Sequence, residues 1–151
     1  MKTINEWFDE YSKSHQNKTN KLIHWFCVPT ILFSIIGILA HFSALLTALI
    51  IVLCLIFYGR LDLVLAVAMA ALMLTMAWLI FVLPVGTGFY ITLFVFAWIG
   101  QFYGHKIEGK KPSFFKDLQF LLIGPIWCMD AYLAKLVPKF KSHSRAQMNA
   151  I

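Results

Sequence analysis

Three of the five histidines in this chain stand near the ends of apolar segments, where they are the residues best suited to chemistry. His15 precedes the first long apolar segment, His24 lies near its start, and His105 lies near the end of the fourth. Ionisable groups at membrane depth are costly, so their presence there favours a functional site. His41 falls in a link between apolar segments and His143 in a polar tail, where an interfacial or solvated role suffices.

The spacing of His15 and His24 sets a condition on any shared site. They are nine positions apart, which at about 100° per residue places them on opposite faces of one continuous helix. They can share a site only if the chain breaks between them. Residues 15–21 (HQNKTNK) supply such a break, and Asn17, Thr19 and Asn20 are each candidate N-caps for a following helix.

His105 and Glu108 are three residues apart and share a face if their helix continues. Imidazoles with a nearby carboxylate suit Fe, Mn or Zn, and two histidines with one carboxylate form the non-haem Fe(II) arrangement used with O2. His24, His105 and Glu108 can supply that set, with His15 as a fourth ligand or a base. The alternative is a scatter of unrelated interfacial histidines.

Gly100 and Gly104 precede His105 at a four-residue spacing. Gly104 would let a ligand or a neighbouring backbone come close, and the pair equally indicates tight helix packing. The sequence has no Gly-rich phosphate loop, GxSxG nucleophile elbow or HExxH zinc helix.

The composition predicts that an integral membrane protein positions these residues. The chain has 151 residues, enough for a single domain, with 60% hydrophobic and only 13% charged residues, against about 25% charged in soluble domains. Its net charge of +6 favours anionic lipid headgroups as partners. The sequence lacks the basic run interleaved with aromatic residues that would indicate nucleic-acid binding. The three cysteines are too few and too dispersed for a disulfide framework or a zinc site.

The expected fold is an all-α helical bundle in the membrane. Apolar segments near the length that spans a bilayer, joined by short links, predict four antiparallel transmembrane helices. A polar N-terminal segment at residues 2–14 has an apolar stripe that predicts an amphipathic helix on the membrane surface. The stripe consists of Ile4, Trp7, Phe8 and Tyr11, and the four spans are expected at about 22–40, 42–58, 63–83 and 88–104.

The apolar segment 118–137 is interrupted at Gly124–Pro125 and contains Asp130. Four spans with a cytoplasmic N-terminus keep every Lys and Arg inside, whereas a fifth crossing would export the basic residues of the C-terminal tail. We therefore expect a broken re-entrant or interfacial helix and two cytoplasmic termini. A true fifth span has the same apolar pattern and stays the alternative.

Two segments of the chain carry a resemblance to a known family. Tyr11–Pro29 contains the pattern H-x-N-x-x-N-x-x-x-H before Val-Pro, and Trp98–Pro112 contains Q-F-x-G-H-x-x-E before Pro. Together they resemble the fungal 2-hydroxy fatty acid dioxygenase family, a small helical membrane family, over nearly the whole chain.

The resemblance implies an Fe(II)-dependent dioxygenase that uses O2 to shorten a long-chain 2-hydroxy fatty acid by one carbon, a step of fatty acid α-oxidation. It implies His15, His24 and His105 as metal ligands, with His15 and Glu108 as the catalytic pair. Asn17, Asn20, Glu108 and Asp130 would hydrogen-bond the ligands or join them.

The basic residues Lys106, Lys110 and Lys111 are candidates for steering the anionic head group, or are simply topology charges. The expected location is the bacterial inner membrane or, in a eukaryote, the endoplasmic reticulum. The runner-up function is a non-catalytic small membrane protein that binds lipids or partner proteins. The sequence leaves the oligomeric state open.

Overall fold

All regular structure in the described part of the chain is α-helical, as the sequence predicts. The structure, a computed structural model, describes residues 2–109 and 120–143. The helices are α1 (Ile4–Ser12), α2 (Lys18–Phe42), α3 (Ala44–Leu61), α4 (Leu63–Val82), α5 (Thr87–Ile107) and α7 (Ile123–Leu136).

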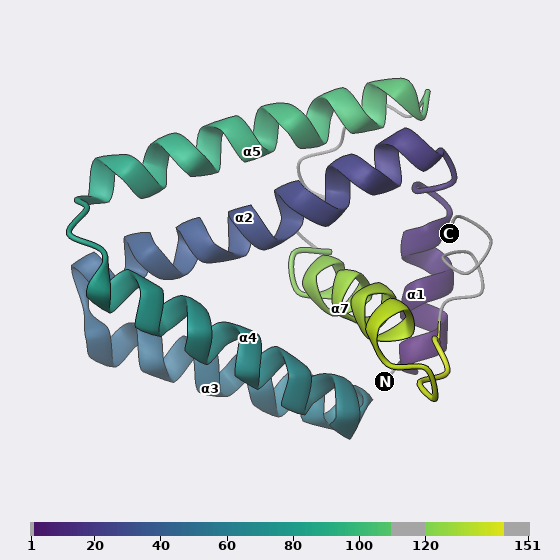
Figure 1. Ribbon diagram of the computed structural model, residues 1–151, viewed down its shortest axis with the longest axis horizontal. Coiled ribbons are helices and arrows are strands. Elements are labelled where there is room, and N and C mark those ends of the chain that lie inside the picture. Colours follow the sequence, from purple (N-terminus) through teal and green to yellow (C-terminus); the bar gives the residue numbers. More distant parts are fainter. Residues whose placement is uncertain (1, 110–119, 144–151) are drawn as a thin grey trace.

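Three of these helices, α2, α3 and α4, are long and apolar enough to cross a membrane. Helix α5 has 21 residues, but polar side chains such as Gln101, His105 and Lys106 near its C-terminal end lower its hydropathy. The fourth expected span therefore stays a prediction, although α5 lies beside α2 along its length (Figure 1).

The long helices form two antiparallel pairs, α2 with α5 and α3 with α4, which meet at one end and diverge toward the other (Figure 1). Side-chain N-caps begin α3 and α4 directly after the helices that precede them. The Ser43 hydroxyl accepts a hydrogen bond from the N–H of Leu46 at 3.2 Å, and the Asp62 carboxylate accepts one from the N–H of Leu65 at 2.8 Å. Each cap satisfies a backbone donor that the first helical turn leaves free.

Glycines let α2 and α5 approach closely. A Cβ atom on Gly100 would lie 2.6 Å from Sγ of Cys27, and one on Gly104 would collide with Oδ1 of Asn20. The small-residue spacing therefore serves tight packing of α5 on α2.

The outer faces of the bundle are strongly apolar. Phe81, Leu45 and Phe96 are 89%, 82% and 68% exposed, respectively. A surface of this kind is suited to lipid contact. The two links at the end where the pairs meet, Ser43 and 83–86, contain no Lys or Arg, as the positive-inside argument requires of outer loops.

Helix α1 differs from the expected membrane-surface helix in what covers its apolar stripe. Its start is fixed by a capping box between Thr3 and Glu6. Ile4, Phe8 and Tyr11 are buried in a cluster with residues of α7. The amphipathic pattern is the same for a lipid-facing and a protein-facing stripe, and here the protein covers it.

Helix α7 corrects the expectation of a helix broken at Gly124–Pro125. The helix begins at Ile123, so the proline stands in the first turn, where its missing N–H costs no hydrogen bond. With 14 residues, α7 is shorter than the roughly 20 residues needed for a span. Residues 123–131 are all buried, between the divergent ends of the two helix pairs (Figure 1). Residues 118 and 119 lie outside the described part.

Candidate metal centre

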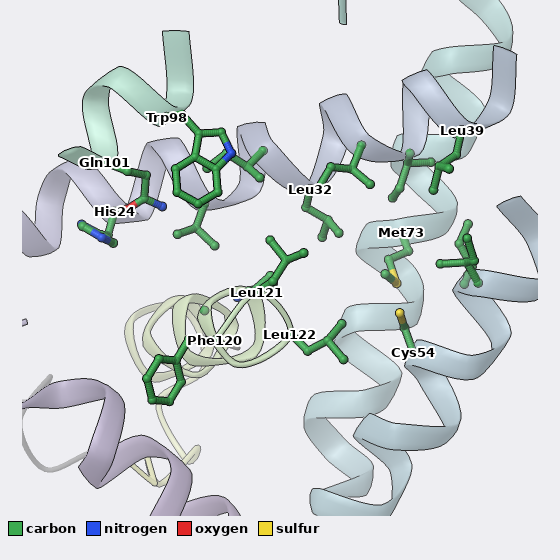
Figure 2. Close-up of a pocket in the computed structure, with 18 of the residues that line it drawn as sticks. His24, Leu32, Leu39, Cys54, Met73, Trp98, Gln101, Phe120, Leu121 and Leu122 are labelled. Atoms are coloured by element: carbon green, nitrogen blue, oxygen red, sulfur yellow. The ribbon is translucent and has the colours of Figure 1, made fainter. Parts of the chain in front are cut away.

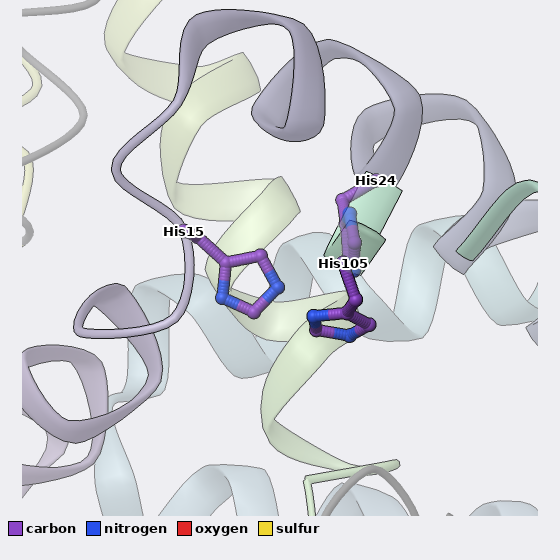
Figure 3. Close-up of side chains that lie close together, drawn as sticks. All are labelled: His15, His24 and His105. Carbon is purple, nitrogen blue, oxygen red and sulfur yellow. The ribbon is translucent and has the colours of Figure 1, made fainter. Parts of the chain in front are cut away.

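The side chains of His15, His24 and His105 lie together, although three different segments supply them (Figure 3). One ring nitrogen from each can be chosen so that all lie within 4.8 Å of one another. The ring centroids of His15 and His24 are 4.3 Å apart, and those of His24 and His105 are 4.9 Å apart. All three side chains are buried.

Backbone carbonyls orient two of these imidazoles. Nδ1 of His15 lies 2.7 Å from the carbonyl oxygen of Tyr11, and Nδ1 of His24 lies 2.9 Å from that of Asn20. A carbonyl oxygen only accepts, so each Nδ1 carries the proton and each Nε2 carries the lone pair. Metal-bound histidines show this same arrangement, in which the second ring nitrogen donates to a carbonyl.

The ring of His15 is also held by stacking. It lies face to face with the ring of Tyr11, with centroids 4.1 Å apart and planes inclined by 11°. Trp127 of α7 approaches the same ring at 5.6 Å, and its Nε1–H donates to the hydroxyl of Ser12 at 3.2 Å. The docking of α1 on α7 therefore sets the position of His15.

The break that the spacing of the histidines requires lies between α1 and α2. Asn17 caps α2 by accepting hydrogen bonds from the N–H groups of Thr19 and Asn20. His15 thus stands in the connection, outside both helices, and faces His24, which lies in the second turn of α2 (Figure 3).

Glu108, which directly follows α5, stabilises this break through three hydrogen bonds. Oε1 accepts the N–H of Gln16 and Oε2 accepts the N–H of Asn17, each at 2.8 Å. Oε2 also accepts the side-chain N–H of Asn20 at 3.0 Å. Burial acts to raise the pKa of Glu108, but the hydrogen bonds from Asn17, Asn20 and Gln16 outweigh it and hold the pKa below its ordinary value of 4.5.

Asn17 and Asn20 both belong to this arrangement, whereas Asp130 does not join the histidines. Its carboxylate is buried in α7, where Oδ1 accepts the N–H of His143 at 3.0 Å and Oδ2 accepts the hydroxyl of Ser142. Nε2 of His143 lies 3.4 Å from Oδ2 of Asp62. Asp130 therefore binds the C-terminal tail.

Other expected positions fall as follows. His41 lies at the far end of α2, with Nδ1 2.8 Å from the carbonyl oxygen of Gly37 and Nε2 3.2 Å from that of Val85. Lys106 is exposed near the centre. Lys110 and Lys111 lie outside the described residues.

A cavity of about 130 Å³ adjoins the histidine cluster between the helix pairs. His24, His105, Gln101 and Tyr11 line one end, and apolar side chains from α2, α3, α4 and the start of α7 line most of the rest (Figure 2). Gln101 lies in the second motif but was assigned no role from the sequence. Its position, a polar amide within an apolar segment and one turn before His105, is itself an indication of a site residue.

The chemistry of the donor set fits a metal ion. Neutral imidazoles suit Fe, Zn, Cu and Ni, and three protein ligands leave coordination positions open for substrate. The carbonyl contacts of His15 and His24 leave the lone pair of Nε2 on each ring available to an ion. The part of the chain that the structure describes thus defines a helical, membrane-type protein with a buried three-histidine centre beside an apolar cavity.

Comparison with known proteins assigns this chain to a family. A family profile described as 2-hydroxy-palmitic acid dioxygenase Mpo1-like matches residues 1–136. The chain is 34% identical over 142 residues to the 2-hydroxy-palmitic acid dioxygenase MPO1 of Saccharomyces cerevisiae, an alignment that covers 87% of this chain and 82% of that protein. The chain belongs to the Mpo1-like family, as its two motifs predict. No solved structure matches it.

Proposed function

We propose that this protein is an Fe(II)-dependent dioxygenase that shortens a long-chain 2-hydroxy fatty acid by one carbon. The observation that carries the proposal is the buried three-histidine cluster at the polar end of an apolar cavity. Membership of the Mpo1-like family and the name of its yeast relative support the substrate class. Loss of C1 as carbon dioxide, with C2 becoming the new carboxyl, uses one O2 and releases one water.

His15, His24 and His105 would hold the iron, which supplies O2 activation at open coordination positions. Where the iron is held without it, His15 would instead act as a base through Nε2, because its Nδ1–H is donated to the carbonyl oxygen of Tyr11 and its ring faces the other two imidazoles. Glu108 completes the centre by holding the segment that carries His15, and Asn17 and Asn20 support it through their hydrogen bonds.

The substrate would enter the cavity with its head group at the histidine cluster. Gln101 is 8% exposed, and its amide oxygen has no hydrogen-bond partner among the described residues. This oxygen would accept a hydrogen bond from the 2-hydroxyl group of the substrate, because a buried acceptor without a partner gains most from a donor brought by the ligand. Lys106, together with Lys110 and Lys111 a few positions later in the sequence, would attract the carboxylate from the surface.

The proposed setting is a membrane with both termini on the cytoplasmic side, whether a bacterial inner membrane or the endoplasmic reticulum. The apolar helices and the absence of Lys and Arg from the links at one end support this orientation. Asp130, bonded to the tail at residues 142–143, would hold the C-terminal segment against the bundle on that side.

The decisive experiment measures metal and turnover in one preparation. Protein purified without oxygen is analysed for iron, manganese, zinc and copper, and O2 uptake is then followed with 2-hydroxypalmitate and with palmitate. We expect iron near one per chain, O2 uptake with the hydroxy acid alone, and pentadecanoate as product. Metal-free protein that consumes no O2 after iron is added would instead favour a lipid- or partner-binding role.

A further inference from the structure

The cavity beside the histidine cluster is polar at one end only. His24, His105 and Gln101 stand at that end, and the buried amide oxygen of Gln101 faces no hydrogen-bond partner in the described chain. Farther along, Figure 2 shows Leu32, Leu39, Cys54 and Met73 around the space. Thr47 also lines it, but its hydroxyl donates to the carbonyl oxygen of Ser43 at 2.8 Å. The far end is therefore suited to a hydrocarbon chain.

The length of the cavity fits such a chain. Helix α2 lines it from His24 to Leu39, and a rise of 1.5 Å per residue places these two positions about 22 Å apart along the helix. An extended long-chain fatty acid has a comparable length. A ligand whose carboxyl end lies at the histidines would bring its methyl end near Leu39.

A closely packed cluster borders the distal half of the cavity. Ile36 and Met73 belong both to its wall and to a buried cluster with Met76, Ile80 and Tyr90. Packed protein interiors contain few voids larger than a water molecule. The hydrocarbon chain thus has a fixed amount of space before it meets this cluster.

We propose that the cavity is an acyl channel with one polar end, in which side chains of the distal half, above all Cys54 and Met73, set the longest chain accepted. The inference deepens the proposed function and rests on it for the identity of the head group. The ligand class is a long-chain 2-hydroxy acid with its carboxyl end at the histidines and its methyl end toward Leu39.

Two substitutions move the end of the channel in opposite directions. Cys54→Phe places a ring across the space and excludes the last methylenes of a long chain. Met73→Ala removes a side chain from the wall and admits more of them. Each methylene that gains or loses burial changes the dissociation constant about fourfold.

The matched controls replace exposed neighbours on the same helices. Leu53→Phe on α3 and Leu74→Ala on α4 make similar changes at side chains that are 57% and 64% exposed and do not line the cavity. Circular dichroism and thermal unfolding in the same detergent establish that each variant is folded.

The test measures equilibrium binding of 2-hydroxydodecanoate, 2-hydroxypalmitate and 2-hydroxyicosanoate to the full chain, by displacement of a fluorescent fatty acid. For Cys54→Phe we expect binding of the longest acid to weaken more than tenfold while the shortest changes less than about twofold. Met73→Ala should strengthen the longest acid relative to the shortest, and both controls should keep the wild-type profile. If Cys54→Phe is unfolded, Met73→Ala decides the matter.

Unchanged chain-length profiles in both cavity variants would overturn the channel, even if wild-type protein oxidises 2-hydroxypalmitate. Conversely, shifted binding profiles in a protein that consumes no O2 would support the channel and refute the proposed reaction. Because binding is measured without turnover, the two failures are distinguishable.

Discussion

Oε2 of Glu108 lies 3.0 Å from Nδ2 of Asn20, so the C-cap residue of α5 is hydrogen-bonded to the first turn of α2. The same carboxylate receives the backbone N–H groups of Gln16 and Asn17. His105 lies three residues before Glu108, and His15 lies directly before Gln16. One carboxylate therefore fixes the distance between two candidate ligands by holding their backbones.

Glu108→Gln should lower metal affinity about 10- to 100-fold, as loss of a group that orients ligands does. The amide offers one acceptor oxygen where the carboxylate offers two, and its NH2 group would face a backbone N–H. His105→Ala should be more severe, because it removes a donor. Iron content and competition with a chelator measure both effects, with Glu10→Gln, which alters an exposed carboxylate on α1, as the control. Full iron and full turnover in Glu108→Gln would exclude Glu108 from the centre.

The lowered pKa of Glu108 predicts a pH dependence of stability with a definite sign. Above its ordinary pKa of 4.5, the folded and unfolded states both carry the ionised group, so its stabilisation is complete. As pH falls below 4.5 toward the lowered native pKa, the unfolded state takes up the proton first and the stabilisation is lost. Thermal unfolding of metal-free wild type and Glu108→Gln should therefore differ most near neutral pH and converge in acid. A gap that widens in acid would contradict this sign.

Alanine at His15, His24 or His105 should abolish stoichiometric iron, because two imidazoles are too few donors for a stable site. His41→Ala is the control, since His41 contacts Gly37 and Val85 at the opposite end of α2. Elemental analysis of proteins purified side by side measures the effect. Iron lost from His41→Ala and retained by His105→Ala would move the centre elsewhere.

Gly104→Ala should disturb the centre through packing alone. Its methyl group would collide with Oδ1 of Asn20 and lie 3.3 Å from Cε1 of His24. Overpacking of this kind costs about 1–3 kcal/mol, and we expect reduced iron content as His24 shifts. Gly88→Ala, on the same helix with nothing within 4 Å of the added carbon, should leave both quantities near wild type. Equal thermal stability of the two variants would contradict the close α2–α5 contact.

Gln101→Met should separate substrate recognition from stability. Methionine has a similar length and removes a buried amide oxygen that has no hydrogen-bond partner in the described chain, so thermal stability should hold or rise. The dissociation constant for 2-hydroxypalmitate should increase about 3- to 10-fold, the worth of one hydrogen bond. Palmitate, which lacks the hydroxyl, is the control ligand and should bind wild type and variant alike. Equal weakening for both acids would assign Gln101 a packing role.

Local chemistry made much of this architecture predictable. The polar run after His15 indicates a helix start, and the structure begins α2 at Lys18 with Asn17 as the cap. The apolar segment was expected only from residue 22, because hydropathy does not register a polar first turn. The same run explains how His15 and His24 can face each other. Helix geometry alone predicts that this requires a break in the chain between them.

Long-range contacts account for what the sequence left open. Nothing local distinguishes an α1 stripe facing lipid from one facing Trp127, since both require the same spacing of apolar residues. Gly124–Pro125 indicates a helix boundary as well as a break, and only the packing of α7 decides between them. Asp130 lies within one apolar segment and Glu108 follows another, yet of the two only Glu108 meets the connection that carries His15.

The nine residues of α1 are too few for a helix that is stable by itself in water. His15 therefore reaches the other two histidines only while α1 is docked, and an ion held by all three would stabilise the docked state by mass action. Binding of the ion and docking of α1 are then linked equilibria, so that each favours the other. Limited proteolysis near residues 13–17 would then serve as a titration of the ion, slowing in proportion as the centre fills.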